Sequence, residues 1–459
     1  MHHIRLTEPC SKHGRIKLRR YTSLFTTKRN NTDEFLIYSS ITNCFIDVSE
    51  DVFQKINLAR KNGNINKSLF SKNTFEFLKE AKIIVAPTAD DAFVRQCEID
   101  TYISNYASSH MSLSLAPTSS CNFVCPYCYE KSKPNNTMSD STIDSLVKFI
   151  NGHEQVKTVG ITWYGGEPLV AFETIKKIVE RIDSDCRAKL ISQDIVTNGY
   201  NFNDKVIEFF KCHPLKRIQI TIDGPEEEHN KLRKLANGKG TYNRIISNIS
   251  SIIQGLPNTH VVIRVNIGKD NQDGYPILCK ELQERFPNKI SVYPGFIRIH
   301  DENQTHLVCD SMEQKDAIIF YEKLESEGSI DIDYYPNLCQ KRGCVATCST
   351  AYVVGPLGEL YKCWNDMGNG EMIVGNIASE ELIRPDLYNQ YMVEGSWISD
   401  DDCKKCFFLP ICSGGCAWQR VRNKFHGGLY NFCSIYKEGG IEKFLRAYYN
   451  KVIALNKKS

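Results

Sequence analysis

Three cysteines lie close together in the first third of the 459-residue chain, at a spacing suited to binding an iron-sulfur cluster. They are Cys121, Cys125 and Cys128, which form the pattern CxxxCxxC. A 4Fe-4S cluster usually takes four thiolates, so three from one short loop would leave one iron free for another ligand. Zinc sites usually pair their cysteines as two CxxC units. The spacing therefore favours an open iron-sulfur cluster. A zinc site with a distant fourth ligand, or buried structural cysteines, are the alternatives.

The last third of the chain carries a second and larger cysteine array. Seven of its members have a regular spacing: Cys348, Cys363, Cys403, Cys406, Cys412, Cys416 and Cys433. Between the first two lie nine residues, then Gly358, then four more residues. Two full 4Fe-4S sites would need eight thiolates. Cys344 could supply the eighth, and Cys339 is its rival. A zinc ribbon could use the same thiolates, but redox-silent zinc could not relay electrons.

Small polar motifs follow the expected strands of the middle segment. They are WYGGEP (163–168), TNG (197–199), TIDG (221–224), and His229, Asn230 and Arg233. Any one of these motifs would by itself be read as a turn or a helix cap. Their shared position at the carboxyl ends of strands instead favours a common binding site.

Together these segments resemble the radical S-adenosylmethionine (SAM) superfamily, including the aromatic Tyr127 before the last cysteine of the first motif. WYGGEP is similar to the family's GGEP motif, and His229 to Arg233 resemble its HDxxR with Asn230 in place of Asp. The resemblance implies that Cys121, Cys125 and Cys128 hold a catalytic cluster that binds and cleaves SAM. It also implies that the product is a 5'-deoxyadenosyl radical, which takes a hydrogen atom from the substrate. The SAM contacts implied are Tyr127, Gly165, Gly166, Glu167, Asn198, Thr221 and Arg233.

The second array resembles the SPASM domain of radical SAM maturases. The resemblance implies two auxiliary 4Fe-4S clusters, and hence three clusters in all. One would be held by Cys344, Cys348, Cys363 and Cys416, and the other by Cys403, Cys406, Cys412 and Cys433.

The same resemblance implies a polypeptide substrate. Sulfatase maturases oxidise Cys or Ser to formylglycine, and an Asp directly after their second auxiliary cysteine acts as the base of this reaction. This chain has Trp364 at that position. Asp366 is the candidate replacement base, although a turn role suits it better. We therefore expect a maturase of ribosomally made peptides (RiPPs) that installs a crosslink, with a thioether preferred. A sulfatase maturase and a non-catalytic iron-sulfur electron carrier are the alternatives.

The elements that must position these residues are read from apolar periodicity. Six strand-like runs alternate with amphipathic helices between residues 112 and 295, which predicts an α/β fold with a partial (β/α)6 barrel. The expected domains are an N-terminal α+β, winged-helix-like unit (1–105), the barrel (106–330), the SPASM domain (331–435) and a C-terminal helix (436–459).

The first of these units is expected to contain strands at FLIYSS and CFIDV, a helix capped by Ser49, a second helix and a short strand. This order and the acidic Asp90-Asp91 resemble a leader-peptide recognition element, to whose sheet edge a leader could add a strand. A plain structural extension is the alternative.

Composition narrows the partners. The net charge of +3 gives no sign of a nucleic-acid or membrane surface, and no export signal or long apolar stretch is present. A cytoplasmic protein is expected, with a precursor peptide and an external one-electron donor of the flavodoxin or ferredoxin type as partners.

Overall fold

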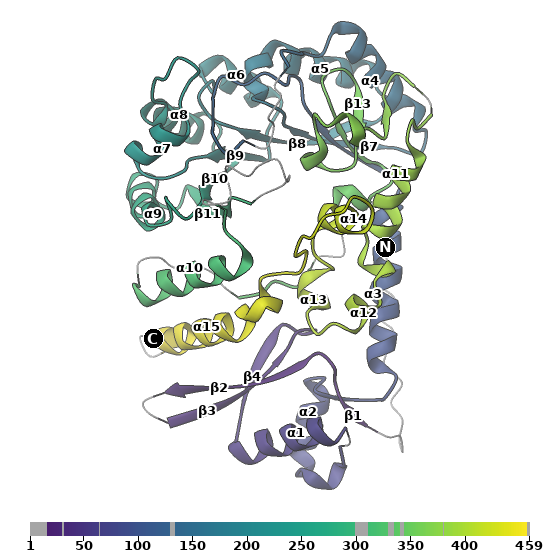
Figure 1. The fold of residues 1–459 in the computed structure, drawn as a ribbon, viewed down its shortest axis with the longest axis vertical. Helices are drawn as coiled ribbons and strands as arrows, with labels where there is room; N and C mark the ends of the chain where they lie inside the picture. The colour runs from purple at the N-terminus through teal and green to yellow at the C-terminus, as the bar shows by residue number, and fades with distance from the viewer. Residues whose placement is uncertain are drawn as a thin grey trace. The chain divides into compact units, whose positions relative to one another are not determined.

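The computed structural model describes residues 16–29, 32–63, 65–128, 134–298, 311–328, 335–339, 344–379 and 381–456. The chain divides into two compact units (Figure 1). Unit 1 comprises Met1–Asn105, Asp333–Gly343 and Val393–Ser459, and unit 2 comprises Tyr106–Ile332 and Cys344–Met392. The expected SPASM segment, 331–435, contributes residues to both units, so its description as one domain stays a prediction.

Unit 2 is built on one large sheet, which has nine strands in the described part of the chain, in the order β11-β10-β9-β8-β7-β6-β12-β13-β14. Its parallel core consists of β6 (His110–Leu115), β7 (Thr158–Trp163), β8 (Lys189–Thr197), β9 (Arg217–Thr221), β10 (His260–Ile267) and β11 (Ile290–Phe296). β12 (Ala351–Val354) continues this core in parallel, and β13 (Glu359–Tyr361) and β14 (Gly375–Asn376) close it in antiparallel fashion. The α/β architecture expected from the sequence is therefore confirmed.

Helices connect the parallel strands and lie along the outer side of the sheet (Figure 1). They are α4 (Asp140–Gly152), α5 (Phe172–Asp185), α6 (Asp204–Cys212), α7 (Glu226–Leu232), α8 (Tyr242–Gly255) and α9 (Gly274–Arg285). In α4 the buried residues Ile143, Leu146, Val147 and Ile150 recur at helical spacing, so one face packs inward. Unit 2 also contains α10 (Gln314–Ser326), the short helix α11 (Pro385–Asn389) and the 3₁₀ helix η2 (Pro168–Ala171).

Unit 1 combines both ends of the chain. β2 (Thr22–Arg29), β3 (Thr32–Ser39) and β4 (Cys44–Val48) form an antiparallel sheet in that order, and β1 (Lys17–Leu18) pairs with β5 (Ile84–Val85). The helices are α1 (Glu50–Asn62), α2 (Lys72–Glu80), α3 (Ala89–Asn105), α12 (Asp401–Lys405), α13 (Leu409–Cys412), α14 (Ala417–Phe425) and α15 (Ile441–Asn456). Ser49 caps α1 as expected, because its hydroxyl accepts a hydrogen bond from the Val52 amide. The structure also contains β1, β2 and α3, which the sequence analysis did not predict.

The core of unit 1 joins the N-terminal sheet to the C-terminal segment. Apolar side chains from β2, β3, α13 and α15 pack in one buried cluster, which contains Phe25, Leu36, Tyr38, Ile411, Ile441, Leu445 and Tyr449. The N-terminal residues therefore share their core with the cysteine-rich segment.

Among the described residues, no helix is both long and apolar enough to cross a membrane.

Candidate functional site

A cleft of about 350 Å³ opens at the carboxyl ends of the parallel strands in unit 2. Its described lining includes every residue expected to hold the catalytic cluster or SAM: Cys121, Cys125, Tyr127, Cys128, Gly165, Gly166, Glu167, Asn198, Thr221 and Arg233. These residues lie at or beyond the carboxyl ends of β6, β7, β8 and β9, which lie next to one another in the sheet. The sheet therefore brings together motifs that are far apart in the sequence.

The two glycines after β7 are required by a neighbouring loop. A Cβ on Gly165, whose φ is +117°, would lie 2.6 Å from the carbonyl oxygen of Thr118, and a Cβ on Gly166 would collide with the carbonyl oxygens of Ser119 and Ser120. The Glu167 amide donates to the Ser120 carbonyl at 2.8 Å. The backbone leading to Cys121 thus fills the space beside both glycines, and a side chain at either position would displace it.

Glu167 places a buried carboxylate in the cleft. Oε1 accepts hydrogen bonds from the Leu169 amide at 3.1 Å and the Thr197 hydroxyl at 2.6 Å, and Oε2 accepts one from the Asn198 amide at 2.7 Å. Burial raises the pKa of Glu167, although these three hydrogen bonds oppose the rise. A carboxylate has about four acceptor positions, so Oε2 retains room for a further donor.

A second buried network centres on Tyr127. Its hydroxyl donates to Asp223 Oδ2 and accepts from Arg233 Nη1 at 2.7 Å and Asn266 Nδ2 at 3.2 Å. Arg233 Nη1 lies 4.0 Å from Asp223 Oδ2. Burial raises the pKa of Tyr127 well above its usual value, so the phenol keeps its proton. The network connects the cysteine loop with β9, β10 and the end of α7.

The histidine and asparagine of the fourth polar motif hold the backbone beside this network. His229 Nδ1 accepts from the Asp223 amide at 3.3 Å, and Nε2 lies 2.9 Å from the Thr241 hydroxyl. Asn230 Oδ1 accepts from the amides of Thr241 and Tyr242 at 2.7 and 3.1 Å. Their amide and hydroxyl partners indicate a positioning role.

The segment after Cys363 contributes an aromatic wall. Trp364 lines the cleft, and its ring centroid lies 4.6 Å from that of Tyr164. Asp366 is fully buried, accepts a hydrogen bond from the Tyr391 hydroxyl and does not belong to the described lining. Its role as a base stays a prediction, and its surroundings suit a structural carboxylate.

Sequence reasoning missed five polar or aromatic lining residues from β9, β10, β11 and the segment directly after β11. These are Gln219, Arg264, Asn266, Phe296 and Arg298. Arg264 Nε donates to Asn266 Oδ1 at 2.9 Å, and its guanidinium lies so close to Gly295 that a Cβ there would collide with it. Polar residues near the carboxyl ends of predicted strands were the available signal, but no known motif marked them.

Four of the auxiliary cysteines meet around a cavity of about 100 Å³ in unit 1. Its lining includes Cys403, Cys406, Cys412 and Cys433, the set expected for one auxiliary cluster. Their sulfurs receive several donors: Cys403 from Arg420 at 2.8 Å, Cys406 from the Phe408 amide at 3.4 Å, and Cys433 from Lys437 at 3.4 Å. Donors and cations directed at sulfur suit thiolates bound to a cluster.

The remaining auxiliary cysteines fall in both units. Cys344, Cys348 and Cys363 belong to unit 2, whereas Cys416 and Cys339 belong to unit 1. Cys344 is close enough to Cys348 to raise the pKa of that thiol, after burial, whereas Cys339 lies near Ser413 and Cys412. Cys344 as the eighth ligand, with Cys339 as its rival, stays a prediction.

A buried lysine lies between the first two of these cysteines and the sheet. Lys362 Nζ donates to the carbonyls of Cys348 and Ala351 at 2.6 and 2.8 Å, and burial lowers its pKa to about 7. Among the residues that the structure describes, no group of three or more His, Cys, Asp or Glu side chains is arranged to hold a single metal ion.

Comparisons with known proteins agree with the fold and the motifs. Residues 115–276 match the family model of the radical SAM superfamily. A cysteine-type anaerobic sulfatase-maturating enzyme from Clostridium novyi is 27% identical, over 71% of this chain and 93% of its own length. The radical SAM cyclopropyl synthase TigE from Paramaledivibacter caminithermalis is 21% identical, over 90% of this chain and 92% of its own length. The solved structure of native anSMEcpe with bound AdoMet and Cp18Cys peptide has a TM-score of 0.58 at 22% identity, and covers 76% of this chain and all of that one (100%).

Proposed function

We propose that this chain, whose residues 115–276 match the family model of the radical SAM superfamily, is a peptide maturase that installs a crosslink, of the thioether class, in a ribosomally made precursor peptide. The observation that carries this proposal is the cleft of unit 2, where three thiols and the polar strand-end residues converge. Residues with no shared role would not be expected to meet at the carboxyl edge of one sheet.

The residues of the cleft fit the cofactor that the family uses. Cys121, Cys125 and Cys128 supply three thiols from one loop, which suits a 4Fe-4S cluster with one open iron. The Glu167 carboxylate, with an acceptor position to spare, suits the ammonium group of SAM. When bound, the cluster and SAM supply the 5'-deoxyadenosyl radical that accepts a hydrogen atom from the substrate.

The protein's own residues then position and shield these groups. The Tyr127 network fixes the cysteine loop relative to β9 and β10 through Asp223, Arg233 and Asn266. Trp364 and Tyr164 form an apolar wall that limits access of water to the radical. Shielding of this kind directs the radical to the substrate.

Two observations favour a crosslinking peptide maturase over a sulfatase maturase. Within the described lining of the cleft, Glu167 is the one carboxylate, and Asp366, the candidate replacement base, lies outside that lining, which disfavours formylglycine formation. The match to the cyclopropyl synthase also extends over 90% of this chain, against 71% for the sulfatase-maturating enzyme. This chain therefore shares more of its length with a relative outside the sulfatase maturases.

The auxiliary cysteines give the reaction a place for its surplus electron. Forming a thioether joins sulfur to carbon and removes the thiol proton, one hydrogen atom and one electron. The hydrogen atom goes to the deoxyadenosyl radical and the proton to solvent. We assign the electron to two auxiliary clusters, one on Cys403, Cys406, Cys412 and Cys433, and the other on Cys344, Cys348, Cys363 and Cys416.

The main test is anaerobic reconstitution followed by iron counting and a SAM-cleavage assay. We expect about twelve irons per chain, since each 4Fe-4S cluster holds four, and 5'-deoxyadenosine after reduction. Mass spectrometry of a co-expressed precursor should then show loss of the thiol hydrogen and one carbon-bound hydrogen. Zinc in place of iron, or exchange of the peptide sulfur for oxygen, would refute the proposal.

Leader recognition by the N-terminal sheet is a separate part of the proposal. β2 and β4 each pair on one side with β3, so both present an edge within the described chain. Truncation is a poor test, because the sheet shares its core with α13 and α15. A photo-crosslinking amino acid at Thr26 or Cys44 in the full-length chain should instead capture a precursor peptide. The exposed Lys79 of α2 is the control position, and equal capture there would count against this part.

A further inference from the structure

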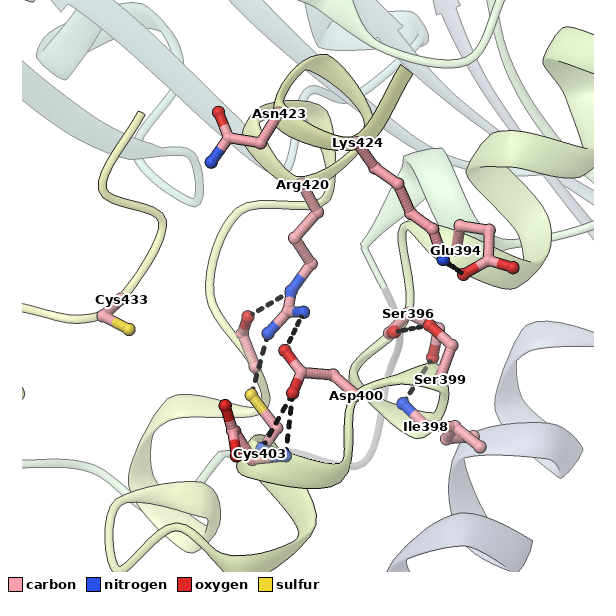
Figure 2. A network of polar contacts seen from close by, with 12 residues as sticks. Glu394, Ser396, Ile398, Ser399, Asp400, Cys403, Arg420, Asn423, Lys424 and Cys433 are labelled. Atoms are coloured by element: carbon pink, nitrogen blue, oxygen red, sulfur yellow. Dashed lines mark hydrogen bonds and ion pairs between the residues drawn. The ribbon is translucent and has the colours of Figure 1, made fainter. Parts of the chain in front are cut away.

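A buried arginine contacts one of the proposed cluster ligands in unit 1. Arg420 of α14 is 7% exposed, and its Nη2 lies 2.8 Å from the sulfur of Cys403. Nη1 donates to Asp400 Oδ2 at 2.6 Å, and Nε donates to the Gly414 carbonyl at 2.8 Å (Figure 2). The guanidinium carbon also lies 4.1 Å from the ring centroid of Phe432. The side chain is therefore held on several sides.

Asp400 completes the arrangement from the other side. Its Oδ1 accepts hydrogen bonds from the amides of Asp402 and Cys403 at 2.9 and 3.1 Å, which caps α12 (Figure 2). One carboxylate thus holds both the backbone of Cys403 and the guanidinium that contacts its sulfur. A cation and an anion stand at fixed positions beside the same thiol.

The chemistry of the guanidinium explains why it suits this position. Arginine stays charged and presents several donors in one rigid plane, so it can bond sulfur, carboxylate and carbonyl together. Lysine carries the same charge without this fork. A guanidinium that served only to anchor α14 would not need a donor directed at a sulfur.

We propose that Arg420 and Asp400 set the reduction potential of the auxiliary cluster held by Cys403, Cys406, Cys412 and Cys433. This inference rests on the auxiliary cluster of the proposed function and assigns its tuning residues. Potentials of such clusters depend on net charge and on hydrogen bonds to sulfur. Reduction adds a negative charge, so the Arg420 cation favours the reduced cluster and the Asp400 anion opposes it.

The two side chains therefore make opposite predictions. Arg420→Gln removes the cation and leaves the Asp400 anion, which should shift the potential to more negative values. Asp400→Asn removes the anion and leaves the cation, which should shift the potential to more positive values. A purely structural pair would give no shift, or shifts in the same direction, because either change breaks the same contact.

The experiment is a redox titration followed by electron paramagnetic resonance on the full-length, anaerobically reconstituted protein. Replacing Cys121, Cys125 and Cys128 with Ala removes the signal of the SAM-binding cluster. We expect a change of at least tenfold in the ratio of reduced to oxidised cluster in Arg420→Gln, which is about 59 mV for one electron. Lys424→Gln is the matched control, because Lys424 lies on the same helix and pairs with Glu394 at 2.6 Å. It should leave the potential unchanged.

The outcomes separate this inference from the proposed function. An unchanged or more positive potential in Arg420→Gln, or a more negative one in Asp400→Asn, overturns it while peptide crosslinking stands. If Arg420→Gln takes up less iron, the sign of the Asp400→Asn shift decides. Arg420→Lys should retain the cluster with a smaller shift. Equal iron content in the wild type and a Cys403→Ala variant would show that Cys403 holds no cluster. This inference would then be wrong, while the assignment of SAM cleavage would stand.

Discussion

Replacing Glu167 with Gln removes one charge from the cleft and keeps nearly the same shape. The carboxylate accepts from the Leu169 and Asn198 amides and the Thr197 hydroxyl. A glutamine has one acceptor oxygen, so it can serve the Leu169 side or the Asn198 side, but not both. Either orientation leaves one buried backbone N–H without an acceptor, which costs about 1–3 kcal/mol of folding free energy.

The same substitution should weaken SAM binding. If the carboxylate holds the SAM ammonium group, its loss removes a charge-assisted hydrogen bond of about 1.5–3 kcal/mol. At 1.4 kcal/mol for each factor of ten, the Kd should rise roughly 10- to 150-fold. Because burial raises the pKa of Glu167, wild-type affinity should also fall as pH decreases toward that raised pKa, where the carboxylate takes up a proton.

The assay is equilibrium dialysis of SAM against the reconstituted protein at several pH values, together with thermal unfolding. Glu173→Gln is the matched control, because Glu173 is exposed at the start of α5 and pairs with Lys176 at 3.0 Å. Its effect on stability should stay within about 0.5 kcal/mol. A destabilised Glu167→Gln protein that binds SAM normally would show that Glu167 only caps the backbone, and would refute the ligand role.

Three further substitutions test the remaining parts of the cleft. Gly166→Ala should displace the loop that leads to the first cysteine motif and lower the iron content by about one cluster, whereas Gly152→Ala, which meets nothing within 4 Å, should not. Burial keeps the pKa of His229 well below its usual value. The contribution of neutral, buried His229 to the free energy of unfolding is therefore fully present above about pH 6.5. It is lost as pH falls, because the unfolded chain then takes up the proton. His229→Gln should reduce this loss in urea titrations, and an unaltered pH profile would contradict the burial of a neutral His229. Trp364→Leu removes the ring contact with Tyr164 and should raise the amount of 5'-deoxyadenosine formed per crosslinked peptide, measured by chromatography; an unchanged ratio would show that the wall does not shield the radical.

Much of this protein was predictable from the sequence because the relevant signals are local. The CxxxCxxC spacing, the glycines before Glu167 and the regular auxiliary array lie in short segments whose residue types already restrict the chemistry. The α/β fold followed from the alternation of apolar strands and amphipathic helices. The helix capped by Ser49 was readable from a single residue and the periodicity behind it.

Tertiary structure alone decided the rest, because it depends on which distant segments pack together. The contacts between Arg420, Asp400 and Cys403 join separate segments of the chain, and no rule of sequence spacing predicts them. The core shared by the N-terminal sheet and α15 was equally unpredictable, because an apolar face in the sequence does not indicate which other segment packs against it. Sequence thus determined which residues can do chemistry, whereas long-range packing decided which groups surround them and how far their charges lie apart.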